Sequence, residues 1–182
     1  MIGINDACEI LSWAYNNNIE IWLDGGWGVD ALLGKETRQH NDIDLFVEEK
    51  NYNKFIEIIK NKGFNEIVVE YTSEVHTIWS DNKLRIIDLH MFKDNCDGTI
   101  CYEGEVFQKN IFDGVGKIGN IMVSCINAKN QVLFHLGYEF GESDIHDVKL
   151  LCKEFKSVLS LLPGINLDPL EPGIYTSTAA LI

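Results

Sequence analysis

The sequence has little positive charge. Its 182 residues include 15 Lys and Arg against 28 Asp and Glu, which gives a formal net charge of −13 at pH 7. Proteins that bind a nucleic-acid backbone usually present a basic stripe, so this composition argues against a nucleic-acid partner. An acidic protein is better suited to a cationic small molecule, or to a nucleotide whose charge a metal ion neutralises.

Long apolar runs are also missing. No stretch approaches the roughly 20 apolar residues that a membrane-spanning helix needs. Residues 1–18 contain neither a basic region nor a long apolar segment, so we expect neither a signal peptide nor a membrane span. With 46% hydrophobic residues the chain can still bury a core, which argues against a disordered protein.

The cysteines show no pairing pattern. The five cysteines, at positions 8, 96, 101, 125 and 152, are an odd number without a repeated spacing, and no nearby His or Cys pair completes a zinc-binding pattern. Reduced thiols in a cytoplasmic protein are a simpler interpretation than a disulfide framework.

The hydrophobic pattern predicts an α+β fold, with a small mixed β-sheet flanked by helices and a short C-terminal helical part. Helical spacing occurs over residues 4–16, 27–34, 51–62, 127–140 and 144–162. Strand-like patterns occur over residues 19–23, 42–47, 64–71, 75–80 and 84–92. We expect a loop with short strands over 93–117, a main domain over 1–117, a helical part over 118–162 and an extended tail over 163–182.

Two aspartates occupy alternate positions of one strand-like run, "DIDLFV". On a strand, the side chains of Asp42 and Asp44 leave the same face, while Ile43 and Leu45 point to the core. Without a counter-ion this pair is unfavourable, because two charges about 5 Å apart repel by roughly 3 kcal/mol at an effective dielectric near 20. Oxygen ligands at this spacing suit Mg²⁺.

A third carboxylate interrupts a later apolar run, "RIIDLH". If that strand lies beside residues 42–47, about 4.8 Å away, Asp88 completes a cluster of three. Two metal ions held there could stabilise the attacking and leaving oxygens of a phosphoryl transfer. Gly25 and Gly26 end one strand and begin a helix, and the free N–H groups of such a turn can bind phosphate.

Each signal also has a structural interpretation. A Gly-Gly pair before a helix is more often a simple turn, and alternate aspartates also occur on a solvated strand face. Asp88 could be a buried residue that pairs with Arg38 or Arg85. The occurrence of all three signals in this order favours the metal site.

The segment "WLDGGWGVDALLGKETRQHNDIDL" resembles the lincosamide nucleotidyltransferases and their aminoglycoside relatives, of the polymerase-β-like nucleotidyltransferase superfamily. The later segments "VFQKN" and "LFHLGYEFGESDIHDVK" are similar to the small lincosamide enzymes, so the resemblance covers about residues 10–155. The superfamily pattern is a glycine pair, a helix, two aspartates on a strand and a third acidic residue later. It matches Gly25, Gly26, Asp42, Asp44 and Asp88.

The resemblance implies a nucleotidyltransferase catalytic domain over residues 1–117. Its activity would be transfer of a nucleoside monophosphate, usually AMP from ATP, to a hydroxyl of a lincosamide antibiotic. Asp42 and Asp44 would bind two Mg²⁺ ions, and Asp88 would bind the catalytic ion and receive the acceptor proton. The implied partners are the antibiotic and ATP or another NTP, and relatives of this class are often homodimers.

Several residues are candidates for supporting roles. Arg38 and His40 either contact phosphate or belong to a hydrogen-bonded loop, and Lys149 either binds the triphosphate or lies on a solvated helix face. Asp24 and Asp30 are more simply interpreted as caps or solvated groups. Candidates for the wall of an acceptor cleft are Glu70, Trp79, His90, Tyr102 and Glu103.

Three other functions remain open. The acceptor could be an aminoglycoside, since both antibiotic classes carry amines that an acidic cleft would attract. A minimal nucleotidyltransferase antitoxin that modifies a partner protein is a second alternative, although such antitoxins are typically shorter. A degenerate fold used only for binding is a third, and the three intact aspartates argue against it.

Overall fold

The computed structural model describes residues 1–135, 141–156 and 158. The helices in this part of the chain are α1 (Ile4–Tyr15), α2 (Gly25–Leu33), α3 (Glu49–Asn61), α4 (Ala128–His135), α5 (Glu142–Glu154) and a short 3₁₀ helix, η1 (Lys109–Phe112). The strands are β1 (Ile21–Leu23), β2 (Ile43–Glu48), β3 (Asn65–Ile67), β4 (His76–Ser80), β5 (Ile86–Asp94), β6 (Thr99–Tyr102), β7 (Glu105–Gln108), β8 (Gly114–Ile118) and β9 (Ile121–Cys125).

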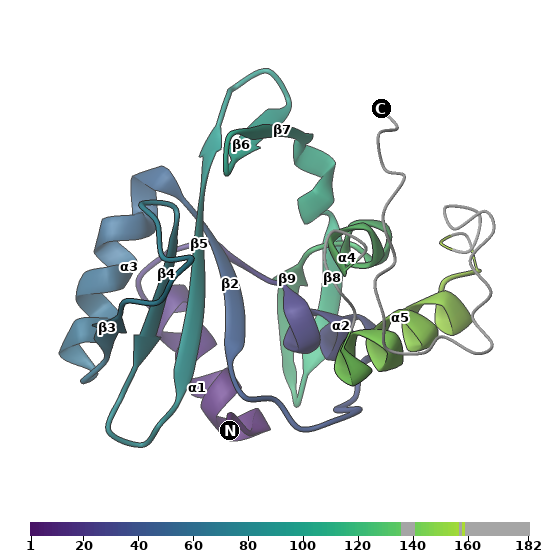
Figure 1. The fold of residues 1–182 in the computed structure, drawn as a ribbon, viewed down its shortest axis with the longest axis horizontal. Helices are drawn as coiled ribbons and strands as arrows, with labels where there is room; N and C mark the ends of the chain where they lie inside the picture. The colour runs from purple at the N-terminus through teal and green to yellow at the C-terminus, as the bar shows by residue number, and fades with distance from the viewer. Residues whose placement is uncertain (136–140, 157, 159–182) are drawn as a thin grey trace.

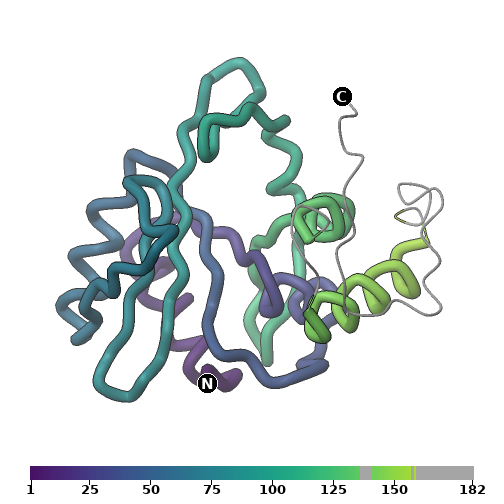
Figure 2. The backbone as a smooth tube through the Cα atoms, viewed as in Figure 1, coloured from purple at the N-terminus to yellow at the C-terminus, as the bar shows by residue number. Residues whose placement is uncertain are grey.

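Over the described residues, nine strands form one mixed sheet, with the order β3-β4-β5-β2-β1-β9-β8 (Figure 1). The remaining strands, β6 and β7, continue from the end of β5 and project beyond the rest of the sheet (Figure 2). The predicted α+β fold with a small mixed sheet is therefore confirmed. No helix in the described ranges is long and apolar enough to cross a membrane.

Alternation along β2 and β5 separates a core face from a polar face. The two strands are parallel neighbours, with Ile43 opposite Ile87 and Leu45 opposite Leu89. These four side chains are fully buried in the main core, together with apolar residues of α1 and α3. Because successive side chains on a strand point to opposite faces, the residues between them, including Asp44, lie on the other face.

The C-terminal helices form a second core around α2. Val29 of α2 is fully buried against Val132 of α4 and Leu151 of α5. Figure 1 shows α4 and α5 beside α2, at the opposite end of the molecule from α3. The helix α2 thus joins the sheet to the C-terminal part, and it ends at Gly34 in the left-handed conformation (φ +70°), as the sequence predicts.

The sequence-based prediction of short strands over 93–117 covers most of β8 but does not include β9. These two strands pair from Gly114 opposite Cys125 to Ile118 opposite Ile121, and β9 pairs with β1. The predicted division after residue 117 therefore falls inside β8. We propose that the helical part begins after Cys125, with α4. The predicted tail over 163–182 lies outside the described residues.

A buried ion pair fixes the turn between β4 and β5. Asp81 Oδ2 accepts hydrogen bonds from Arg85 Nε at 2.8 Å and Nη2 at 2.7 Å, and the two side chains are 2% and 6% exposed. The guanidinium also stacks on the rings of Trp13 and Phe64. Burial alone would raise the pKa of Asp81, but the hydrogen bonds from Arg85 and from nearby backbone N–H groups outweigh it and lower this pKa.

We expect Asp81→Asn to lower the free energy of unfolding by about 1–3 kcal/mol, because it removes the buried carboxylate of the pair and leaves Arg85 with only the more exposed Glu9, at 2.6 Å, and Asp6, at 3.5 Å, as charged partners. Urea denaturation at pH 7 measures this loss, with the exposed Glu57→Gln on α3 as control. The pKa of Asp81 is lowered in the folded state, so its contribution is present above the unfolded pKa of about 3.9 and is lost as the pH falls below it. An unchanged difference between the proteins at pH 3 would contradict this assignment.

Candidate active site

A row of carboxylates crosses the polar face of the sheet. Asp44 of β2 and Asp88 of β5 are direct partners across two parallel strands. Asp24 directly follows β1, and its N–H donates to the carbonyl oxygen of Asp44 at 3.0 Å. Trp22 is the partner of Phe46 in the antiparallel pair β1–β2. Because side chains alternate along a strand, Asp24 lies on the same face as Asp44.

The carboxylates destabilise one another's charged forms. Burial raises the pKa of Asp44 well above its ordinary value, and the charges of Asp42, Asp88 and Asp24 raise it further. Burial also raises the pKa of Asp42, and the charge of Asp88 adds to the effect. The pKa of Asp24 is raised mainly by burial, although a hydrogen bond from Gly25 opposes this. The cluster is therefore a concentration of negative charge whose carboxylates offer only oxygen donors.

The start of α2 packs directly against this cluster, and only glycine fits there. Gly25 has φ +54°, and a Cβ added to it would lie 2.2 Å from Oδ2 of Asp44. A Cβ on Gly26 would lie 2.3 Å from Nη2 of Arg38 and 2.5 Å from Nδ1 of His40. The first N–H groups of a helix have no partner within the helix and can bind an anion. The structure therefore brings these groups next to the carboxylates.

Arg38 and His40 border this helix start and are both held by buried acids. Arg38 donates from Nε at 3.0 Å and from Nη2 at 2.6 Å to Asp147 of α5, which is fully buried. His40 Nε2 lies 2.6 Å from Oδ2 of Asp30, and both residues are 2% exposed. The interpretation of Asp30 as a solvated group is therefore wrong. Its carboxylate also accepts hydrogen bonds from the N–H and hydroxyl of Thr37.

Lys149 is half-buried on α5. A residue two positions along a helix is rotated by about 200°, so Lys149 leaves α5 on the side away from Asp147 and Arg38. Its assignment to the triphosphate stays a prediction. In this region the structure shows an ion pair between Arg38 and Asp147.

Two histidines have ring nitrogens close to the carboxylate of Asp88. His76 Nε2 of β4 is 2.6 Å from Oδ1 of Asp88, and His90 Nε2 of β5 is 3.5 Å from the same oxygen. The hydrogen bond with Asp88 raises the pKa of His76, whereas burial lowers the pKa of His90 to about 4. The ring of His90 stacks on Phe46 and its Nδ1 is 2.8 Å from the hydroxyl of Tyr102.

Only some of the predicted acceptor-cleft residues lie near Asp88. His90, Tyr102 and Glu103 lie near Asp88, since Glu103 is 3.5 Å from His76. Trp79 is only 1% exposed and belongs to the main core, so its prediction as a cleft residue is wrong. Glu70 is exposed in the segment between β3 and β4.

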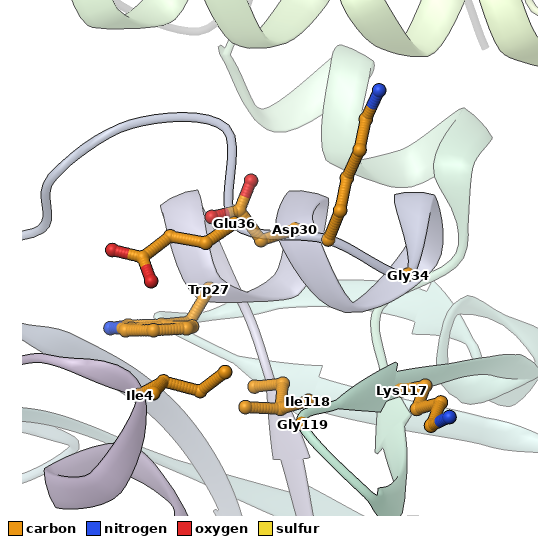
Figure 3. A pocket seen from close by; sticks show the side chains of 9 residues that line it. Ile4, Trp27, Asp30, Gly34, Glu36, Lys117, Ile118 and Gly119 are labelled. Atoms are coloured by element: carbon orange, nitrogen blue, oxygen red, sulfur yellow. The ribbon is translucent and has the colours of Figure 1, made fainter.

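A separate small cavity of about 110 Å³ lies on the other side of α2. Figure 3 shows the indole of Trp27 between α2 and the side chains of Ile4 and Ile118. Trp27 also contacts the ring of His40, with centroids 4.4 Å apart. The cavity lining includes none of the clustered carboxylates, so it is not part of the candidate active site.

Comparisons with known proteins show the family of this chain. A family model described as aminoglycoside-2''-adenylyltransferase matches residues 7–151. A lincosamide resistance protein of Staphylococcus haemolyticus is 34% identical over 154 residues, which are 78% of this chain and 89% of that protein. A 2''-aminoglycoside nucleotidyltransferase of Escherichia coli is 34% identical over 70 residues, 37% of this chain and 40% of the relative.

Solved structures have the same fold. The lincomycin-bound crystal structure of the lincosamide antibiotic adenylyltransferase LnuA matches with a TM-score of 0.73 and 31% identity, over 86% of this chain and 98% of LnuA. The structure of ANT(2")-Ia in complex with adenylyl-2"-tobramycin matches with a TM-score of 0.70 and 20% identity, over 87% of this chain and 93% of that chain. The second likeness concerns the fold alone.

Fold and site together define a nucleotidyltransferase, an enzyme that uses a nucleotide as co-substrate. Within this class, the chain belongs to the aminoglycoside-2''-adenylyltransferase family, and a lincosamide resistance protein is among its relatives.

Sequence reasoning left three residues out of the site: Asp147, His76 and Asp24, which it interpreted as a cap and which stands at the N-cap of α2. Asp24 follows Trp22 at the two-residue spacing of a strand face, and that periodicity was its available signal. Asp147 and His76 have no comparable signal. Their roles depend on contacts with Arg38 and Asp88, which are 109 and 12 residues away along the chain.

Proposed function

We propose that this enzyme transfers AMP from ATP to a hydroxyl of a lincosamide antibiotic and releases pyrophosphate. The observation that carries this proposal is the row of carboxylates beside the glycine start of α2, in a chain 34% identical to a lincosamide resistance protein over most of its length. The relative identified as LnuA was crystallised with lincomycin, which supports the same class of acceptor.

The donor set of the cluster fits Mg²⁺. Carboxylates are the oxygen ligands that Mg²⁺ prefers when it also binds phosphates, and burial and then neighbouring negative charges, which a cation would compensate, raise the pKa values of Asp42 and Asp44. We assign Asp42 and Asp44 to two Mg²⁺ ions and Asp88 to the catalytic one. A metal ion bound there would neutralise the charge that develops on the phosphoryl and leaving oxygens.

The chain's own groups hold the nucleotide and the acceptor. N–H groups at the start of α2 bind phosphate oxygens, and Arg38, oriented by Asp147, adds a positive charge beside them. Asp88 receives the proton of the acceptor hydroxyl. The hydrogen bond from His76 orients the Asp88 carboxylate for this transfer.

The acceptor side of the site is acidic. Glu103 is half-exposed near His76 and Asp88, and its carboxylate would attract the amine of an antibiotic. An aminoglycoside remains the second candidate because the matched family model and one set of relatives bear that name.

Pyrophosphate release tests the proposal, with ATP, Mg²⁺ and one acceptor per assay: lincomycin, clindamycin, kanamycin or gentamicin. We expect turnover with the lincosamides. Turnover only with the aminoglycosides would keep the chemistry and reject the proposed acceptor. Tight binding of Mg-ATP without turnover on any of the four would reject both antibiotic classes and favour a protein acceptor.

A further inference from the structure

The nitrogens of two histidines and one carboxylate oxygen converge beside the carboxylate row. His76, Asp88 and His90 each offer one ligand atom, and these atoms all lie within 4.8 Å of one another. The side chains are 15%, 15% and 11% exposed, so they are mostly buried but remain in reach of solvent. Two imidazoles and a carboxylate are the kind of donor set that zinc enzymes use.

The distances from the two histidine nitrogens to Asp88 can be compared with those of a tetrahedral site. Ligand atoms about 2.0–2.2 Å from a zinc ion are roughly 3.3–3.5 Å from one another. The distance from His90 Nε2 to Asp88 Oδ1 is already 3.5 Å. The distance from His76 Nε2 to the same oxygen is 2.6 Å, and insertion of an ion requires this pair to separate by less than about 1 Å.

Both histidines also have the outer partners that metal-binding imidazoles need. His90 Nδ1 lies 2.8 Å from the hydroxyl of Tyr102, and His76 Nδ1 lies 3.5 Å from a carboxylate oxygen of Glu103. Such partners fix the tautomer and orientation of the ring, so that the other nitrogen can bind the metal. In both residues that other nitrogen, Nε2, is the one directed at Asp88.

We propose that His76, Asp88 and His90 form a binding site for a divalent cation of the zinc class. Imidazole ligands favour Zn²⁺, Co²⁺ and related ions over Mg²⁺, which prefers oxygen. The site is thus distinct in chemistry from the magnesium site of Asp42 and Asp44, but it shares Asp88. Zn²⁺ bound here occupies the oxygen of Asp88 and inhibits transfer. This inhibitory consequence rests on the proposed function, whereas the binding site itself does not.

Calorimetric titration of the full-length protein with Zn²⁺ alone, without nucleotide or antibiotic, tests the site. We expect one ion per chain in the wild type, and His76→Ala and His90→Ala to weaken binding by at least about tenfold. Tyr102→Phe, which removes only the outer partner of His90, should weaken it by about tenfold. Cys96→Ser is the matched control, because Cys96 is an exposed free thiol that could bind zinc by itself, and we expect no change.

Circular dichroism of each variant establishes that it is folded, and Co²⁺ provides a second measurement. A four-coordinate Co²⁺ ion has intense visible absorption, which we expect in the wild type and not in the His76→Ala and His90→Ala variants. Zinc affinity unchanged in both of these variants, or lost in Cys96→Ser, would overturn the proposal. Because the titration contains no substrates, its failure is distinguishable from failure of the transferase activity, which the pyrophosphate assay reports separately.

Discussion

Replacement of Asp44 by asparagine is expected to lower kcat for nucleotidyl transfer by about 10³-fold or more, and to stabilise the metal-free protein at the same time. A metal ligand contributes several kcal/mol to the transition state, and about 4 kcal/mol corresponds to 10³-fold in rate. The stabilisation follows from the raised pKa of Asp44. A carboxylate that is hard to ionise in the folded protein opposes folding at neutral pH.

The two effects are measured on the same preparation. Pyrophosphate release gives kcat, and thermal unfolding in EDTA and in Mg²⁺ gives the stability. We expect Mg²⁺ to raise Tm of the wild type, because a ligand that binds only the folded state stabilises it, and to have a much smaller effect on Asp44→Asn. The exposed Asp113→Asn is the matched control. A variant that is inactive and also less stable than the wild type in EDTA would contradict this account.

The pH dependence has the opposite sign to that of a salt-bridged acid. The folded pKa of Asp44 is raised, so between the unfolded pKa of about 3.9 and the folded pKa the native protein binds more protons than the unfolded chain. The stability of the metal-free wild type is therefore expected to fall as the pH rises through this window. Asparagine at this position removes that part of the dependence.

The second large effect is expected from Gly25→Ala. Alanine at φ +54° costs about 1–2 kcal/mol of backbone strain, and its Cβ would lie 2.2 Å from Oδ2 of Asp44. The carboxylate can rotate away, because it is the end of a side chain, but it then leaves its place in the row. We expect moderate destabilisation with a loss of turnover of at least about 10²-fold, since small displacements at a reacting centre have effects of this size.

The variant Gly34→Ala separates the effect of backbone strain from the effect of the contact with Asp44. Gly34 also has a positive φ, +70°, but a Cβ there would meet nothing within 4 Å. We expect both variants to lose similar stability in urea denaturation, and only Gly25→Ala to lose activity. Equal activity in the two variants would mean that the contact with Asp44 is unimportant for catalysis.

Much of the fold could be predicted from periodicity because local pattern and burial agree in it. The predicted helix over 4–16 is α1, and the strand over 42–47 is β2 with a shift of one residue. The strand β8 was expected only as part of a loop with short strands, because Gly114 and Gly116 make its sequence resemble a loop, and β9 was not assigned. A Cβ on Gly116 would lie 2.3 Å from the backbone of Ala31 in α2. Glycine is required there for close packing of helix on strand.

The candidate site was also predictable only in part. Asp44 and Asp88 were predictable as a pair because each interrupts an apolar strand, and the parallel register of β2 and β5 brings them opposite each other. Their assignment as metal ligands stays a prediction. The contacts of Arg38 with Asp147 and of Asp88 with His76 depend on how helices and strands pack against one another. Hydrophobic patterns within short segments do not predict such packing.

The ion pair between Arg38 and Asp147 determines when, during synthesis of the chain, the candidate site can be completed. The two residues are separated by 109 positions, and β1, the neighbour of β2 in the sheet, also pairs with β9 through Leu23 and Cys125. Chains are synthesised at about 5–20 residues per second, so several seconds elapse between the emergence of Arg38 and that of its partner. A nascent chain that already contains every aspartate of the row still lacks α5, so the ion pair that holds Arg38 forms only after α5 has been synthesised.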